Sequence, residues 1–150
     1  MSQDRVRVSV QVRVPPEVAF TVFTEEIDLW WGRGPAFRVA GRSPGVLTIE
    51  PRLGGRIFEH GADGAPLWDV GVVTTWEPPV RLRFDWRSVT FEPYGSGTRV
   101  TVEHRGWASI RADHPVRHGE PPDAFLRRMG AWWGSLMTSL RAHAGSRDTL

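Results

Sequence analysis

Alternating apolar and polar residues mark the first segment of the chain as a strand. Valines fill every second position in residues 6–14, and Arg, Ser and Gln fill the positions between them. Successive side chains of a strand point to opposite faces, so this pattern is typical of a half-buried antiparallel strand. Pro15 and Pro16 end it, and residues 18–23 and 25–31 predict two short helices.

The middle of the chain predicts a run of short strands separated by turns that contain Gly or Pro. The expected strands are residues 37–40, 46–50, 56–60, 68–76, 80–86 and 98–104. In residues 68–76, the side chains at even positions, from Trp68 to Trp76, are expected on one face. The pair Gly54-Gly55 lies between two strands and has no helix after it, so it predicts a turn rather than a phosphate-binding loop.

The alternation of apolar and polar residues changes phase just after the strand expected at residues 80–86. Apolar residues occupy even positions up to Trp86, but the next two are Val89 and Phe91. A regular strand cannot change phase by one residue. The sequence therefore predicts a bulge or a very tight turn near Arg87 and Ser88, or the loss of a loop there, and these alternatives stay open.

The helical period dominates the end of the chain. After an irregular stretch over residues 106–122, apolar residues recur at steps of three and four from residue 123 to about Gly145. Trp132 and Trp133 lie about 100° apart on such a helix. One of them is therefore expected to face the sheet, and the other the rim of a cavity or a neighbour.

This order of elements predicts an α+β fold in a single domain over residues 1–150. A curved antiparallel sheet of about six or seven strands would wrap around the long C-terminal helix, with two short helices after the first strand. Such a sheet leaves space beside the helix at its open end.

Composition excludes several classes of function. All 19 basic residues are Arg, and they are spread evenly among 17 acidic residues, which argues against nucleic-acid binding. The absence of cysteine excludes disulfides and thiolate chemistry and suits a reducing cytoplasm. No leader or membrane-inserting segment is expected. His114 and His118 have helical spacing, but Pro115 and the missing third ligand argue against a metal site, and no cofactor is expected.

Seven short motifs give the chain a resemblance to a known family. They are residues 14–20, 30–32, 50–56, 61–64, 76–82, 97–102 and 103–107. In this order they resemble the START-like superfamily, also called SRPBCC or birch-pollen-allergen-like, and within it the branch named for the activator of the 90-kDa heat-shock protein ATPase. The resemblance implies a helix-grip fold with a deep cavity. Members bind lipids, sterols, polyketides or hormones, some catalyse cyclisation, and a few act on chaperones.

Aromatic residues and two histidines are the candidate ligand-binding residues. The set is Trp30, Trp31, Phe37, Phe58, His60, Trp68, Trp86, His104 and Trp133. The eight tryptophans could fill the core or line a cavity. His60 and His104 share the strand phase of Phe58 and Val102, so each imidazole points inward if that phase does. Each is then either a satisfied core histidine or a group that orients a ligand or moves a proton.

These observations favour a cytoplasmic protein that binds a small hydrophobic or aromatic molecule. No catalytic constellation can be assigned from the spacings, so an enzyme is the second hypothesis. It would be a cyclase, dehydratase or hydrolase that uses a cavity histidine, and a perturbed histidine pKa beside another polar group would favour it. A chaperone-regulating module is the third hypothesis, and a homodimer is left open.

Overall fold

The computed structural model describes residues 5–32, 45–61, 66–84, 87–105 and 122–147, and it leaves undescribed the side chains at 5, 66–70, 122–125 and 147. Within these ranges it contains seven strands and three helices. Their bounds are β1 Arg5–Val12, α1 Pro16–Glu25, α2 Ile27–Trp30, β2 Val46–Ile49, β3 Arg56–His60, β4 Pro66–Glu77, β5 Arg81–Phe84, β6 Arg87–Tyr94, β7 Gly97–Arg105 and α3 Pro122–Arg147. The strand expected over residues 37–40 lies outside the described residues.

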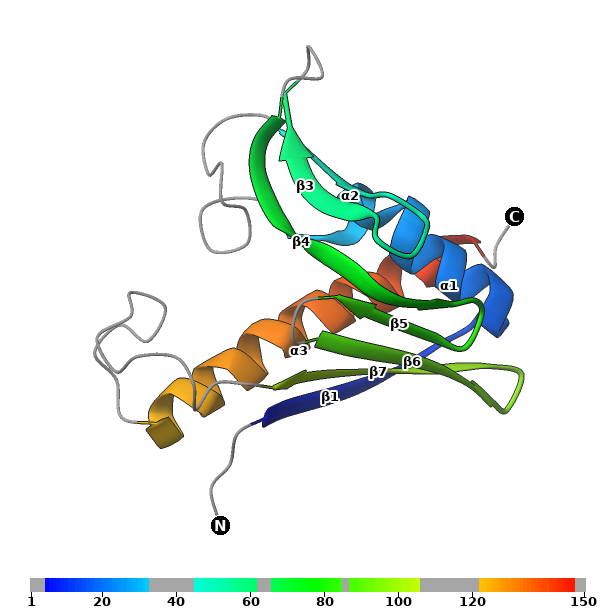
Figure 1. Cartoon of the computed structure of the whole chain (residues 1–150). Coiled ribbons are helices and arrows are strands. Elements are labelled where there is room, and N and C mark those ends of the chain that lie inside the picture. Colours follow the sequence, from blue (N-terminus) through cyan, green and yellow to red (C-terminus); the bar gives the residue numbers. More distant parts are fainter. Residues whose placement is uncertain (1–4, 33–44, 62–65, 85–86, 106–121, 148–150) are drawn as a thin grey trace.

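The seven strands form one antiparallel sheet in the order β1-β7-β6-β5-β4-β3-β2. Strands β2 to β7 follow one another as a meander, and β1 adds to the edge beside β7. The sheet curls so that α3 runs along its inner side, and α1 and α2 close one end (Figure 1). This is the helix-grip arrangement, and the predicted fold class is confirmed.

A two-residue connection accounts for the change of phase in the sequence. Phe84, the last residue of β5, pairs with Arg87, the first residue of β6, so only residues 85–86 lie between them. Beyond the turn, Val89 and Phe91 are buried on the same inner face as Phe84. The pairing therefore favours a short connection over a bulge within one strand, and it places this connection at residues 85–86, which lie outside the described residues.

The expectation that even positions of residues 68–76 share one face is wrong. Val72 and Thr74 are exposed, whereas Val73 is buried. A register shift between Val73 and Thr75 changes the phase, because the extra residue of a bulge turns the side chains that follow it to the other face. Trp76 then returns to the inner side, where its ring lies 5.0 Å from that of Phe20.

The predicted turn at Gly54-Gly55 is confirmed, and it also anchors β4. Gly54 has a φ of 78°, a left-handed conformation that glycine adopts without strain. A Cβ on Gly55 would collide with the carbonyl oxygen of Glu50. The amide of Gly54 donates to the carbonyl of Val73 at 2.9 Å, and the amide of Val73 donates to the carbonyl of Gly55 at 2.8 Å.

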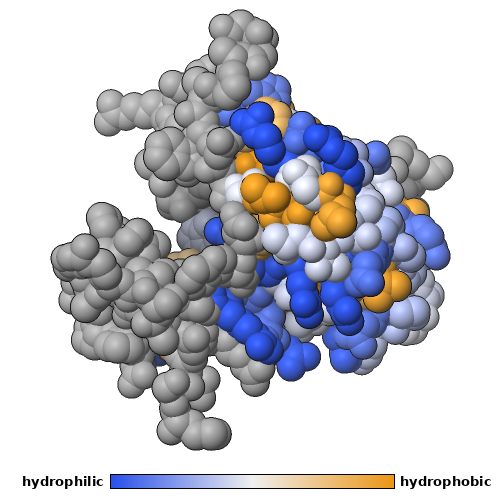
Figure 2. Space-filling view, viewed as in Figure 1, coloured by the Kyte–Doolittle hydropathy of each residue, from blue (hydrophilic) through white to orange (hydrophobic). Residues whose placement is uncertain are grey.

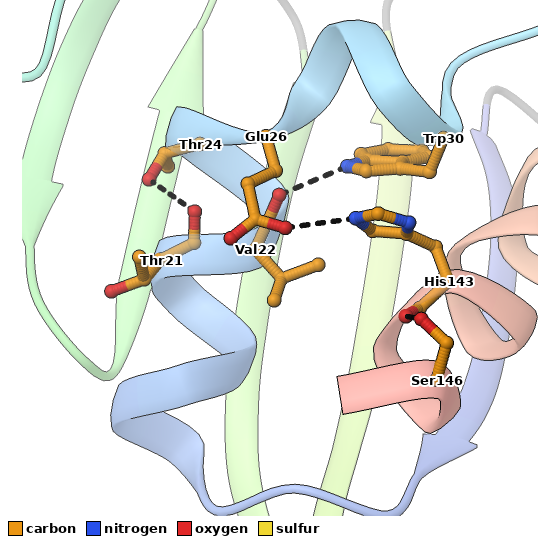
Figure 3. Close-up of polar contacts among 7 residues, drawn as sticks. All are labelled: Thr21, Val22, Thr24, Glu26, Trp30, His143 and Ser146. Carbon is orange, nitrogen blue, oxygen red and sulfur yellow. Dashed lines mark hydrogen bonds and ion pairs between the residues drawn. The ribbon is translucent and has the colours of Figure 1, made fainter. Parts of the chain in front are cut away.

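Polar contacts fasten the C-terminal part of α3 to the α1–α2 pair (Figure 3). His143 Nε2 and Glu26 Oε1 are 2.8 Å apart, which joins α3 to the junction between the two short helices. Trp30 is buried beside them, and its indole N–H donates to the carbonyl of Val22 at 3.1 Å. Ser139 donates its hydroxyl to the carbonyl of Trp30. This end of the molecule is therefore closed by packing and by hydrogen bonds.

Candidate functional site

His104 is a polar side chain that the regular strand β7 directs onto the inner face of the sheet. Val100 and Val102 precede it in the same phase and are fully buried, and His104 is 7% exposed. Its cross-strand partners are Val6 on β1 and Arg87 on β6. Residues directly opposite each other on antiparallel strands share a face. The expected inward phase of His104 is therefore what the structure shows.

Trp133 of α3 fixes the protonation pattern of this histidine. The indole is fully buried, and its Nε1–H donates a hydrogen bond of 3.2 Å to His104 Nδ1. Because an indole N–H can only donate, Nδ1 must be the acceptor nitrogen, and the neutral ring carries its proton on Nε2. Burial, and secondly the Arg87 guanidinium, lower the pKa of His104 from 6.5 to about 3. The imidazole is therefore neutral at physiological pH.

Arg87 places a guanidinium beside this neutral imidazole. Its Cζ lies 5.3 Å from the centre of the Phe84 ring, its partner across the β5–β6 turn. Its Nε is buried, and the residue as a whole is half-buried. A charge in such a position acts through a lower dielectric than at the surface, so its influence on nearby groups is larger.

Three tryptophans form an aromatic cluster next to this pair. The Trp31 ring lies 5.7 Å from those of Trp132 and of Trp133, with interplanar angles of 75° and 90°. The Trp132 and Trp133 rings are 5.1 Å apart at 88°. These are edge-to-face contacts, the geometry that aromatic quadrupoles favour. Trp133 is buried and Trp132 is half-buried, in agreement with their predicted separation around the helix.

Trp30 lies within the hydrophobic core rather than on a surface that a ligand could contact. It is 1% exposed, its ring lies 4.9 Å from that of Phe23, and its N–H is bound to a main-chain carbonyl. These contacts explain Trp30 as a packing residue, so we leave it out of the proposed site.

The structure contradicts the inward orientation expected for Phe58 and His60. The buried residues of β3 are Ile57 and Glu59, which alternate with Phe58 and His60 along the strand. Phe58 lies under the guanidinium of Arg56, and His60 Nε2 is 2.9 Å from the hydroxyl of Thr48 on β2. Both candidates therefore lie on the outer side of the sheet.

Three other candidates cannot be placed. Phe37 and Trp86 lie outside the described residues, and for Trp68 only the backbone is described. Sequence reasoning also missed two inner residues. Arg87 shares the phase of Val89 and Phe91, which the position of the turn would have revealed. Glu59 is 1% exposed, and no signal in an alternation of apolar and polar residues predicts a buried carboxylate.

The described residues indicate neither a metal centre nor a membrane span. They contain no group of three or more His, Asp or Glu side chains arranged to hold a metal ion. No helix among them has the length and apolar character needed to cross a bilayer. The inner cluster thus brings together a neutral imidazole, a guanidinium and indole rings.

Comparison with known proteins assigns the chain to a family. Residues 13–145 match the family described as Activator of Hsp90 ATPase homolog 1-like protein. The chain belongs to this family. The resemblance to that branch of the START-like superfamily is thus confirmed. No curated protein matches the chain.

Solved structures similar to this family member include two that show the fold. Protein NE0264 from Nitrosomonas europaea is 15% identical with a TM-score of 0.63, over 100% of this chain and 99% of that one. The Aha1 dimer from Colwellia psychrerythraea is 14% identical with a TM-score of 0.62, over 95% and 97%. A third structure is Txn09, an anthrahydroquino-gamma-pyrone synthase complexed with a molecule named SUM. It is 27% identical with a TM-score of 0.52, over 93% of this chain and 99% of that one.

Proposed function

We propose that the chain binds a small aromatic molecule that carries an oxygen function, on the inner face of the sheet beside α3. The observation that carries the proposal is the position of two polar side chains, His104 and Arg87, next to an aromatic cluster. A mostly apolar surface with a few placed polar groups is the usual character of a small-molecule site, and the inner cluster has this composition.

The cluster can contact both the rings and the oxygen of such a ligand. The indoles of Trp31 and Trp132 supply apolar surface, worth about 25 cal/mol per Å² removed from water. The Nε2–H of His104 and the Arg87 guanidinium can both donate to a carbonyl or phenolate oxygen. Burial of the ligand's rings then provides the affinity, and hydrogen bonds to its oxygen fix its orientation.

One of the similar structures supports this class of ligand. The synthase Txn09 is named for its product, an anthrahydroquino-γ-pyrone, and it was solved in complex with SUM. Both parts of that product name are oxygenated ring systems. The likeness extends over 93% of this chain.

Two probe molecules test the proposal, and quenching of tryptophan fluorescence measures the binding of each. We expect saturable one-to-one binding of 1,8-dihydroxyanthraquinone, and we expect Arg87→Met to weaken it about tenfold, the effect of losing one charge-assisted hydrogen bond. Anthracene has no oxygen, so its binding should be the same in both proteins. Failure of the quinone to saturate, or equal affinity in the variant, would refute the proposal.

Catalysis on the bound molecule is the second candidate, because the pKa of His104 is strongly perturbed beside Arg87. A neutral imidazole with a pKa of about 3 is a poor base, so its role would be donation. His104 and Arg87 would stabilise the negative charge that develops on a carbonyl oxygen during conjugate addition. A suitable probe is a hydroxyanthraquinone with an adjacent ynone. Its phenol oxygen bonds to the alkyne carbon, the phenol proton moves to the neighbouring carbon, and a γ-pyrone ring results.

Mass spectrometry separates the two candidates. Conversion of this ynone by the wild-type protein, lost in His104→Asn with binding of the dihydroxyanthraquinone retained, would establish catalysis. Binding without faster conversion than in buffer would leave the chain a binding protein.

Chaperone regulation rests on the family description. Stimulation of Hsp90 ATPase activity by the purified chain would support it, and an unchanged rate would exclude it. Self-association also stays a prediction, suggested by the Aha1 dimer and measurable by light scattering. The cytoplasmic location likewise stays a prediction.

A further inference from the structure

The outer face of the central strands holds a hollow of about 390 Å³ that differs chemically from the inner cluster. Its lining comes from the four successive strands β4 to β7, and it contains guanidinium, hydroxyl and carboxylate groups. The side chains used below are Arg81, Arg83, Ser88, Thr90, Glu103 and Arg105. The part of the surface that is coloured in Figure 2 is mostly hydrophilic, with hydrophobic residues in small groups. The charged and hydroxyl-bearing lining of the hollow does not suit the aromatic ligand proposed for the inner face.

The strand register arranges these groups in rows across the sheet. Arg83 lies opposite Ser88, which lies opposite Glu103 on β7. Arg81 lies opposite Thr90 in the next row on the same face. Side chains in directly opposite positions have Cβ atoms about 4.5–5.5 Å apart. Each arginine of β5 is thus next to a hydroxyl of β6.

Positive charge dominates the hollow within the part of the chain that the structure describes. Arg81 pairs with Glu77 at 3.5 Å, but the two side chains are 42% and 57% exposed, so the pair is weak and readily exchanged. Arg105 contacts Glu103. Arg83 is exposed, and no ion pair with a described residue is found for it. Arg87 also borders the hollow, although its guanidinium lies over Phe84 on the inner side.

We propose that this outer hollow binds the phosphate group of a small molecule. Arginine forks donate two parallel hydrogen bonds to a phosphate, and neighbouring serine and threonine hydroxyls can donate to its remaining oxygens. The hollow offers both kinds of donor side by side on β5 and β6. Arg87 borders both sites, but the phosphate proposal does not use its guanidinium, so either proposal can fail without the other.

Sodium pyrophosphate is the probe for this site, titrated into ¹⁵N-labelled full-length protein at constant ionic strength. We expect saturable shifts of the Nε–H signals of Arg81, Arg83 and Arg105 and of the amides of Ser88 and Thr90. Arg83→Gln should weaken binding about tenfold, since it removes a charge-assisted hydrogen bond. The matched control is Arg127→Gln, at an exposed arginine of α3, and it should bind as the wild type does.

Vesicles distinguish a free phosphate compound from a lipid headgroup. Binding to phosphatidylcholine vesicles only when they contain phosphatidylinositol 4-phosphate would identify a headgroup site. Binding of pyrophosphate without vesicle binding would identify a free ligand, and both results support the proposal. Equal shifts with sulfate, shifts spread over all arginines, or equal affinity in Arg83→Gln and Arg127→Gln would overturn it. If Arg83→Gln does not fold, Ser88→Ala takes its place, with the same requirement for weaker binding.

Discussion

The Nε1–H of Trp133 donates to Nδ1 of His104 at 3.2 Å, so a tryptophan of the helix determines the tautomer of a histidine of the sheet. Trp133→Phe keeps an aromatic ring but removes the donor, which leaves a buried acceptor unsatisfied. We expect a loss of about 1–3 kcal/mol in the free energy of unfolding, measured by urea denaturation. Trp76→Phe is the control, because it removes an indole that packs on Phe20 rather than on His104. Equal losses in the two variants would contradict the assigned role.

Stability should depend on pH through His104. The pKa of its imidazole is about 3 in the folded chain and near 6.5 in the unfolded chain, so between these values only the unfolded state takes up the proton. The free energy of unfolding should therefore fall as the pH falls below 6.5, with a slope that approaches about 1.4 kcal/mol per pH unit. His104→Asn keeps an acceptor for Trp133 but does not titrate. Denaturation of both proteins between pH 4.5 and 6.5 should show this difference in slope, and parallel curves would refute it.

Substitution of two glycines should have opposite effects. Gly55→Ala forces a Cβ into the carbonyl oxygen of Glu50 and disturbs the turn that holds Val73 of β4. We expect a loss of at least about 2 kcal/mol in stability, as for other backbone clashes. A Cβ at Gly134 in α3 would meet no atom within 4 Å. Gly134→Ala should therefore raise stability by about 0.5–1 kcal/mol, since alanine favours the helix. Thermal melting measures both changes.

The contact between His143 and Glu26 should show measurable coupling. The two side chains are 23% and 18% exposed, and they join α3 to the α1–α2 junction (Figure 3). A double-mutant cycle with His143→Ala and Glu26→Gln should give a coupling of about 0.5–1.5 kcal/mol. A cycle that pairs Glu26→Gln with Thr138→Ala provides the reference, because the hydroxyl of Thr138 donates within α3, to the carbonyl of Gly134. Additive effects in the first cycle would contradict the expectation.

The sequence predicted the inner residues wherever a strand alternates without interruption. In β7, the phase of Val100 and Val102 carries directly to His104, and this placement was correct. In β3, the same reasoning placed Phe58 inward and failed, because a glutamate at position 59 occupies the buried phase. Alternation assigns faces by polarity, so it cannot recognise a strand whose buried side includes a carboxylate.

Irregular backbone was the second source of error. The bulge in β4 put Val72 and Trp76 on opposite faces, although their even positions and apolar character had suggested one shared face. Arg87 was overlooked because the sequence located a disturbance near it without deciding between a bulge and a turn. Long-range register decides such cases, and the register comes from strands far away in the chain.

The β5–β6 connection also has a consequence for how related sites could diverge. Since Phe84 pairs with Arg87 across two residues, the length of this connection decides which side chains of β6 face inward. One inserted residue that moved β6 along its neighbours would exchange the whole set of β6 side chains between the two faces. The guanidinium beside His104 would turn outward, and the hydroxyl of Ser88 would turn inward. A change in the length of one short turn could thus alter the chemistry of both faces at once, with no substitution in any strand.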